Sequence, residues 1–396
     1  MKLAPEGHIA LLNYTYEIEG PHLERAVQQI AELLEAKNSI LRTTIVRAGA
    51  NFVQVLLAKR ISSFVYTSDY CLVRNDKTHG KTFFVISIHH MVSDGFSRYL
   101  IEKELRHILR SPETYADVSE RPRYGGFASH LRASRPEAQV LQYWDKYLQG
   151  STMATIHPSQ PESLGYSDGA VVEVIPARTL QARSHAGQTD IILAAWSLAL
   201  YRYSGLRDVV FGMLRHGRSH PYEDTRRMIG PIMCSTPFRM KFEQGNESSD
   251  RILHRVQDEL LSTVPWEQDY VPGVADGYPL AQSIINLKSE LYAMPEGSED
   301  VDKKDYVSRL FVRHDLQDYE MNRAWAIYFV IHQNLGNFSF QMYYSSPLLP
   351  HDKAETLFKD FLRLVKELGS SQTKTLDELI CVDFEQISAE MEPRCQ

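Results

Sequence analysis

Two neighbouring histidines, followed shortly by an aspartate and a glycine, are the residues of this sequence best suited to chemistry. The segment reads His89-His90-Met91-Val92-Ser93-Asp94-Gly95. An imidazole with a pKa of about 6.5 can take up a proton at neutral pH and return it, as a general base must. A backbone N–H at the start of a helix can stabilise a developing negative charge. Either histidine of the pair is therefore suited to act as a base, and the N–H of Gly95 is placed to stabilise an oxyanion.

The elements around this segment should hold it rigidly. Residues 82–88 form a nearly continuous apolar run, rich in Phe, Val and Ile, which is typical of a buried strand. After Gly95, apolar residues recur at helical spacing, and Ser93 or Asp94 is the expected N-cap of that helix. The segment is thus predicted to lie in a turn between a strand and a helix, from which side chains can project on a rigid scaffold.

A histidine followed four positions later by an aspartate is not a specific signal by itself. Only the pair His90/Asp94 also has a doubled histidine, a following glycine and a setting between a strand and a helix. The spacing occurs four times, at His90/Asp94, His220/Asp224, His254/Asp258 and His314/Asp318.

Composition and charge exclude several classes of partner. The chain has 396 residues and a formal net charge of −7, so it has no basic field to gather nucleic acid or an anionic membrane surface. Its longest apolar stretch, residues 191–200, falls short of the ~18 residues that a membrane span needs, and residues 1–20 do not resemble a signal peptide. The four cysteines form no CxxC pair for zinc or redox exchange. We therefore expect a cytoplasmic protein without a metal site.

Periodicity predicts an α/β protein with two parts. At about 150 residues per domain, the length favours two or three packed units. The Pro- and Gly-containing residues 150–169 place a boundary near residue 160, which gives an N-terminal lobe over residues 1–160 with the histidine motif and a C-terminal lobe over residues 161–396. Helices are predicted over residues 23–34, 136–148, 189–203, 250–263 and 352–368, and strands over residues 41–46, 208–213, 324–332 and 338–344.

Several longer motifs, in the same order along the chain, are similar to those of one known family. Leu41-Arg42-Thr43 resembles an LRT element, and residues 89–95 match the signature HHxxxDG. Gly217-Arg218 precedes residues 229–239, which are similar to an IGxxxNTxPxR stretch. These motifs resemble the condensation domains of nonribosomal peptide synthetases, and residues 212–239 look most like fungal members.

The resemblance implies a fold, a reaction and partners. The fold is that of chloramphenicol acetyltransferase, with two lobes that form a V around a central tunnel. The resemblance implies that His90, the second histidine, points into this tunnel and is the general base, with the N–H of Gly95 at the oxyanion. The implied reaction is attack by an acceptor amine on the thioester carbonyl of an acyl donor, which gives an amide and a free thiol. An acyl or peptidyl carrier protein would hold the donor on its phosphopantetheine arm, the acceptor would be a small-molecule amine or an aminoacyl group, and no cofactor would be bound by the enzyme itself.

The resemblance also implies supporting roles for other residues. Asp94 is expected to pair with an arginine and to hold the loop, and Arg42 is the candidate partner. His89 is expected to be a packed, hydrogen-bonded neighbour of His90. The part of the tunnel near the acceptor is expected to be lined by Gly230, Met233, Ser283 and Asn286.

Two other functions share the motif. A CoA-dependent acyltransferase would use His90 and the same fold but take a CoA thioester, and would modify a small amine or alcohol. A degenerate condensation domain would only recruit partners, and the intact HHxxxDG argues against it. The sequence also departs from the family, because an opening SxAQxRLWxL element is missing. The sequence includes no adenylation or carrier domain, so if the chain is complete, we expect it to meet its carrier protein in trans.

Overall fold

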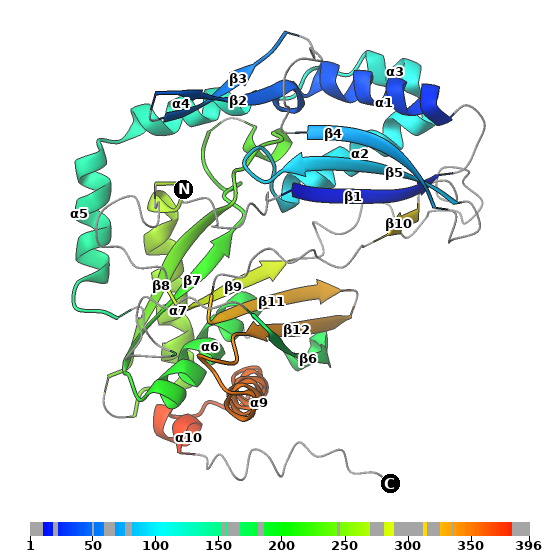
Figure 1. The fold of residues 1–396 in the computed structure, drawn as a ribbon. Helices are drawn as coiled ribbons and strands as arrows, with labels where there is room; N and C mark the ends of the chain where they lie inside the picture. The colour runs from blue at the N-terminus through cyan, green and yellow to red at the C-terminus, as the bar shows by residue number, and fades with distance from the viewer. Residues whose placement is uncertain are drawn as a thin grey trace. The chain divides into compact units, whose positions relative to one another are not determined.

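The structure is a computed structural model. Within the residues that it describes, the strands form one sheet of four strands, one of six and a separate hairpin, and helices accompany both sheets (Figure 1). The predicted α/β class is confirmed. The described residues are 11–18, 23–49, 51–58, 68–75, 81–152, 156, 167–180, 186–222, 224–243, 246–269, 281–288, 312–314, 325–334 and 336–381.

The chain divides into two units that are not simply its two halves. A single boundary near residue 160, with lobes over residues 1–160 and 161–396, is not the division that the structure shows. Residues 218–233 join unit 1 because they hydrogen-bond to the start of the helix that follows the histidine motif. Unit 1 comprises Met1–Ser134, Arg218–Met233 and Leu291–Met321, and unit 2 comprises Arg135–Gly217, Cys234–Glu290 and Asn322–Gln396.

Unit 1 contains a four-stranded antiparallel sheet with the strand order β10-β1-β5-β4. The strand that leads into the histidine motif, β5 (Lys81–His89), lies between β1 (Leu11–Ile18) and β4 (Ser68–Asn75). The short strand β10 (Val312–His314) pairs with the other edge of β1. A strand with neighbours on both sides cannot shift easily, so the last residue of β5 has a fixed position.

Two helices, α1 (Leu23–Lys37) and α2 (Gly95–Arg110), pack on the sheet of unit 1. Alternate residues of β5 point to the same face of the sheet, and Phe84, Ile86 and Ile88 are fully buried there. They share one apolar cluster with Leu34 of α1 and Leu105 of α2. Unit 1 also contains α3 (Pro112–Ala116), α4 (Tyr124–Ser134) and the 3-10 turn η4 (Thr225–Arg227).

The strand predicted over residues 41–46 begins later than its alternation indicated. A 3-10 turn, η1 (Ser39–Arg42), takes up its first residues. The N–H of Leu41 donates to the carbonyl of Asn38 at 3.0 Å, which closes the turn and buries the leucine. The hairpin then follows as β2 (Thr43–Ala48) and β3 (Asn51–Leu56). A buried leucine satisfies the alternating pattern equally well in a tight turn and in a strand.

Unit 2 is built on the six-stranded sheet, in which β9 pairs in parallel with β7 and β11 and the other neighbours are antiparallel. Its predicted helices are confirmed to within one residue at each end, and the strand predicted over residues 324–332 begins at Ile327. The strands, in sheet order, are β6 (Gly169–Pro176), β12 (Asn337–Tyr344), β11 (Ile327–Asn334), β9 (Ser283–Lys288), β7 (Asp208–Arg215) and β8 (Cys234–Lys241). The helices are α5 (Glu137–Leu148), α6 (Gln188–Ser204), α7 (Ser249–Thr263), α9 (His351–Leu368) and α10 (Leu376–Ile380), with short 3-10 turns η3 (Ala177–Thr179) and η5 (Val264–Trp266).

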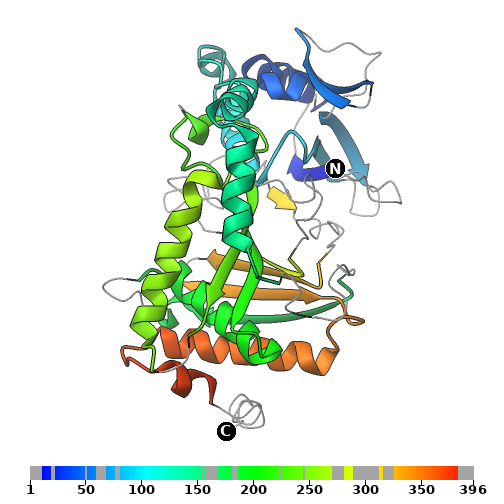
Figure 2. The same cartoon turned by 90° about the vertical axis from the view of Figure 1, so that its left-hand side faces the viewer.

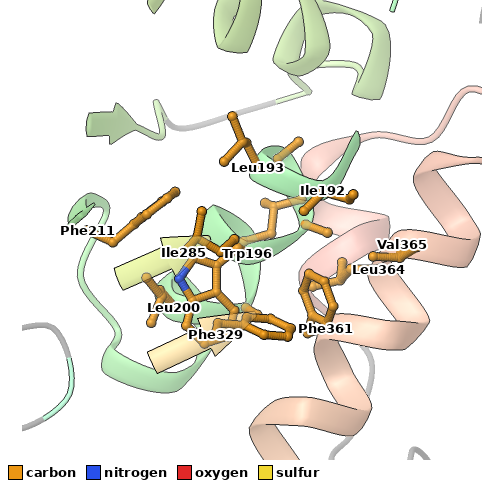
Figure 3. Packing of buried hydrophobic residues seen from close by; sticks show 14 of the residues in the cluster. Ile192, Leu193, Trp196, Leu200, Phe211, Ile285, Phe329, Phe361, Leu364 and Val365 are labelled. Atoms are coloured by element: carbon orange, nitrogen blue, oxygen red, sulfur yellow. The ribbon is translucent and has the colours of Figure 1, made fainter. Parts of the chain in front are cut away.

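The core of unit 2 lies between the sheet and the helices α6 and α9 (Figure 3). Trp196 of α6 is fully buried, and its ring meets that of Phe329 at 5.1 Å and 68° and that of Phe361 at 5.9 Å and 77°. Edge-to-face pairs of this kind stabilise beyond their area burial. The middle of α6 is buried on all sides, as expected of a helix with an almost wholly apolar sequence.

Buried charges anchor the short helix α10, which lies near one end of α9 in Figure 2. Arg202 of α6 pairs with Asp360 of α9 at 2.7 Å and donates to the carbonyl of Ile380 at 2.6 Å. Arg363 of α9 donates to the carbonyl of Leu379 at 2.9 Å. The two arginines thus satisfy carbonyls at the end of α10 that have no partner within the helix.

Candidate active site

The histidine motif forms a tight turn between β5 and α2. His89 is the last residue of β5 and Gly95 the first of α2, and the N–H of Val92 donates to the carbonyl of His89 at 3.0 Å. Asp94 caps the helix: its backbone is extended and its Oδ1 accepts the N–H of Ser97 at 2.7 Å. The predicted strand, turn, helix and cap are confirmed.

The Asp94 carboxylate holds two separate segments of unit 1 together. Its side chain is 1% exposed. Oδ1 also lies 2.7 Å from the hydroxyl of Ser97, and Oδ2 accepts the N–H groups of Ile232 and Met233, each at 3.0 Å. Nη2 of Arg218 lies 2.8 Å from both carboxylate oxygens. These contacts tie residues 218–233 to the start of α2, and they support a structural role for Asp94.

The predicted pairing of Arg42 with Asp94 is wrong, because Arg218 is the arginine that binds this carboxylate. The Arg42 side chain instead donates to backbone carbonyls. Its Nε bonds to Leu57 at 3.2 Å, and its Nη1 bonds to Glu35. Arg42 therefore ties the end of α1 to the residue that follows β3 and has no part in the turn around His90.

Arg218 is the supporting residue that sequence reasoning missed. Its side chain is 2% exposed, and its Nη1 donates to the carbonyls of Thr225, at 2.8 Å, and Met228. The guanidinium also lies 4.6 Å above the centre of the Phe96 ring, at a distance suited to a cation–π contact. The available signal was the Gly217-Arg218 pair, but its partner Asp94 is 124 residues away along the chain, and no local pattern joins the two.

Gly230 is held against both α2 and α4. Its N–H donates to the hydroxyl of Ser97 at 3.0 Å, and its carbonyl lies 3.0 Å from the same hydroxyl. A Cβ at this position would lie 2.6 Å from Cδ2 of Tyr124 in α4. Close approach of the backbone to this ring therefore accounts for the glycine. Its predicted place in a tunnel wall stays a prediction.

We expect Gly230→Ala to lower the free energy of unfolding by about 1–3 kcal/mol, the usual cost of overpacking. The matched control is Gly125→Ala in α4, where a Cβ would meet no described atom within 4 Å. In a helix, that change should be neutral or stabilise by about 0.5–1 kcal/mol. Denaturant unfolding of the two variants and the wild type measures both effects, and equal midpoints for the two variants would contradict the close approach.

His89 supports the turn, as predicted for a packed neighbour. Its Nδ1 accepts the N–H of Met91 at 3.0 Å. Burial lowers the pKa of His89, and the neighbouring charge of His90 lowers it further. Both effects favour the neutral ring, whose Nδ1 holds the backbone that carries His90. Both rings are partly exposed, so His90 is accessible while the residues after it, Val92 to Asp94, are buried.

Gly95 occupies a position where the fold does not need a glycine. It is exposed, it lies in a helix, and its φ is outside the left-handed region. Among the described residues, a Cβ here would meet only Cε of Met233, at 3.7 Å, an ordinary van der Waals distance. A glycine that is required neither by conformation nor by packing fits a place where a ligand approaches the backbone closely.

Ser283 and Asn286, both predicted to line a tunnel, lie on opposite faces of β9, because side chains alternate along a strand. Ser283 shares its face with Ile285, which belongs to the core under α6 and α9. Asn286 shares its face with Ile284, and its amide donates to the hydroxyl of Tyr328 at 2.9 Å. The two residues therefore cannot line the same surface. Because the two residues are three positions apart, their opposite orientation in a strand follows from the sequence alone. For Asn286, the tunnel-lining role stays a prediction.

The part of the chain that the structure describes offers no candidate for a metal site or for a membrane-spanning helix. It contains no group of three or more His, Cys, Asp or Glu side chains arranged to hold a metal ion. No described helix is both long and apolar enough to cross a bilayer.

Comparison with known proteins places the chain among peptide synthetase domains. The family model "Condensation domain" matches residues 70–387. "Nonribosomal peptide synthetase 8" of Gibberella moniliformis is 40% identical over 96% of this chain and 75% of the relative. "Nonribosomal peptide synthetase ALT12" of Alternaria alternata is 37% identical over 94% of this chain and 73% of the relative. Both relatives are fungal, as the spelling of residues 212–239 indicated.

Solved structures confirm the predicted fold. The X-domain from teicoplanin biosynthesis superposes with a TM-score of 0.66 at 15% identity and covers 93% of this chain and 92% of that chain. The first condensation domain of the calcium-dependent antibiotic synthetase superposes with a TM-score of 0.64 at 14% identity and covers 93% of both chains. A family model matches most of the chain, a relative is 40% identical over 96% of the chain, and HHxxxDG begins at the end of β5. The chain therefore belongs to the family of condensation domains of nonribosomal peptide synthetases.

Proposed function

We propose that this condensation domain joins an acyl donor, held as a thioester on a phosphopantetheine arm, to an amine acceptor and so forms an amide. His90 is the general base, and the N–H of Gly95 stabilises the oxyanion. Family membership supports an acyl-transfer reaction, and the likeness to peptide synthetases supports a carrier protein as the partner that presents the donor. The carrier and the choice of donor and acceptor belong to the proposal.

The observation that carries this proposal is the contrast between the surface of the turn and the residues beneath it. His90 is partly exposed and Gly95 is exposed. Ser93, Asp94 and Ser97 under them are at most 1% exposed, and the Asp94 carboxylate is fixed by five hydrogen-bond donors on four residues. A base and an N–H group that reach solvent from a rigid support are pre-organised for catalysis, because little reorganisation is needed during the reaction.

The proposed reaction balances without a further reactant. The acceptor nitrogen attacks the thioester carbon, and the carbonyl electrons move to oxygen, which the N–H of Gly95 stabilises. His90 accepts the proton that the nitrogen loses. The carbon–sulfur bond then breaks, the amide forms, and the proton on His90 passes to the leaving thiolate. The products are an amide and a free thiol, and His90 returns to its neutral form.

The demand on His90 depends on the acceptor. An α-amine with a pKa of about 7.7–8.0 is neutral in roughly a tenth of its molecules at pH 7 and is nucleophilic without help. His90 then needs only to orient the amine and remove the proton from the tetrahedral adduct. A hydroxyl must lose its proton during the attack, so the base is indispensable for ester formation. An amine acceptor therefore makes the smaller demand on His90.

Side-by-side assays of two donor forms test the function directly. The purified chain is incubated with an amine acceptor and with the same acyl group, presented either on a holo carrier protein or as a CoA thioester. Mass spectrometry then detects the amide and the released thiol. We expect an amide from the carrier-bound donor. Product from the CoA thioester alone would favour a CoA-dependent acyltransferase, and binding of the carrier without any product would favour a recruiting domain.

Gly95→Pro isolates the N–H that is proposed to hold the oxyanion. Proline is tolerated at the first position of a helix, where the N–H has no helical partner. The preceding Asp94 is extended (φ −129°, ψ −179°) and so avoids the α region that a following proline disfavours. We expect turnover to fall about a hundredfold, as for the loss of one oxyanion donor, with little change in the unfolding midpoint.

Gly95→Ala is the matched control, because it adds a Cβ and keeps the N–H. It should lose much less turnover than Gly95→Pro with a small donor such as a glycyl thioester. Equal activity of the two variants, each with a wild-type unfolding midpoint, would remove the Gly95 N–H from the proposed mechanism.

A further inference from the structure

We propose that Met233 selects the acyl donor by the size of the substituent next to its reacting carbonyl. The inference rests on the proposed function and goes beyond it, because it assigns a specificity-determining role to one side chain. It places Met233 beside the donor, whereas the family resemblance implied a place in the tunnel wall near the acceptor.

The backbone of Met233 is held by a hydrogen bond, whereas its unbranched side chain can adapt its shape. Its N–H donates to Oδ2 of Asp94 at 3.0 Å, so the residue is attached to the same carboxylate that caps α2. Its side chain is partly exposed. The Cε methyl lies 3.7 Å from the point that a Cβ on Gly95 would occupy. The thioether therefore forms a wall beside the open space at Gly95, and it is anchored independently of any substrate.

The geometry of the adduct determines which part of the substrate meets this wall. The tetrahedral carbon carries the oxyanion, the acceptor nitrogen, the thioester sulfur and the donor's α-carbon. In the proposed mechanism the oxyanion binds at Gly95 and the nitrogen at His90, so the sulfur and the α-carbon are the two groups that remain to contact Met233, whose Cε lies beside Gly95. The sulfur continues into the same methylene arm in every donor. Only contact with the substituent on the α-carbon distinguishes one donor from another.

The chemistry of the side chain points to an apolar substituent of limited size. Methionine is unbranched and polarisable and adapts its shape to apolar neighbours. Its tip leaves no polar group to bind a hydroxyl or a charge on the donor. One methylene more or less in an apolar site changes specificity by about 10- to 200-fold, so truncation at this one position should be measurable.

Donors of graded size, with the acceptor held constant, test the assignment. Glycyl, alanyl and leucyl thioesters are compared on the wild type, Met233→Ala and Met233→Phe by kcat/KM. We expect Met233→Ala to raise the leucyl-to-glycyl ratio by at least about tenfold and Met233→Phe to lower it. Met233→Leu, of similar volume, should shift the ratio less, in the direction of Met233→Ala, and provides a folded variant should the alanine variant unfold.

A control variant and three possible outcomes separate the ways in which the assignment can fail. Leu261→Ala, on an α7 residue that is 68% exposed, should leave all ratios unchanged. If the wild type transfers no acyl group from any donor, the proposed function fails and the inference with it. If the wild type is active but the Met233 variants change all donors by the same factor, only the inference is overturned. A ratio that varies with the acceptor's side chain and not with the donor's would also overturn it, in favour of an acceptor contact.

Discussion

His90→Ala should lower product formation by about two to four orders of magnitude and leave the fold intact, as expected for loss of a general base. His90 is partly exposed at the start of the turn that follows β5, so removal of its side chain creates no buried cavity. Its neighbours hold their places through other contacts: His89 bonds to the N–H of Met91, and Asp94 caps α2. Product is measured by mass spectrometry, and the fold by the unfolding midpoint.

The best control is a histidine with the same sequence spacing in a different setting. His254 also precedes an aspartate, Asp258, by four positions, but both lie in α7 of unit 2. His254 is exposed, and its ring bonds to the carbonyl of Asp250 at 2.8 Å. We expect His254→Ala to leave turnover unchanged. If a well-folded His90→Ala protein keeps its turnover, His90 has no part in the mechanism.

The acceptor changes the expected size of the His90 effect. With a neutral amine, only proton removal from the adduct is lost, so the decrease should lie near the lower end of the range. With a hydroxyl acceptor of equal size, attack and proton removal occur together, and the decrease should lie near the upper end. Equal decreases for the two acceptors would mean that His90 positions the acceptor and does not take its proton.

The parts of the site that the sequence predicted depend on local signals. The apolar run before His89, the capping side chain of Asp94 and the helical spacing after Gly95 each act within a few residues. Physical propensities of strands, caps and helices suffice at that range. These signals gave the strand, the turn, the cap and the helix, and hence the rigid position of His90.

What the sequence did not reveal depends on contacts between distant segments. Arg218 reaches Asp94 across 124 positions, whereas the expectation for Arg42 rests on its place in a motif of the same lobe. The return of residues 218–233 to unit 1 has the same origin, because hydrogen bonds to Asp94 and Ser97 hold that segment. A Pro- and Gly-containing stretch marks a connection in the chain, but it cannot show that a later segment crosses back.

Removing the charge of Asp94 should cost about 3–5 kcal/mol of the free energy of unfolding, the usual penalty for leaving a buried charge unpaired. Asp94→Asn keeps the size of the side chain and one oxygen that can still cap α2. Its new NH₂ group would face the donors that the carboxylate now binds, Arg218, Ile232 and Met233. Because domains are stable by only about 5–15 kcal/mol, a loss of soluble protein is the expected first sign.

Arg218→Met should cost a similar amount, because it leaves the carboxylate of Asp94 buried without its counter-charge. If the two residues act as a unit, the double variant should lose several kcal/mol less than the sum of the two single losses. Arg227→Ala is the control: its pair with Asp224 is 3.2 Å long, with side chains 53% and 39% exposed, and exposed pairs contribute at most about 1 kcal/mol. Denaturant unfolding of all four variants gives the comparison. A stable Asp94→Asn protein without activity would contradict a purely structural role for this carboxylate and point to a direct one, because loss of its support should lower the unfolding midpoint first.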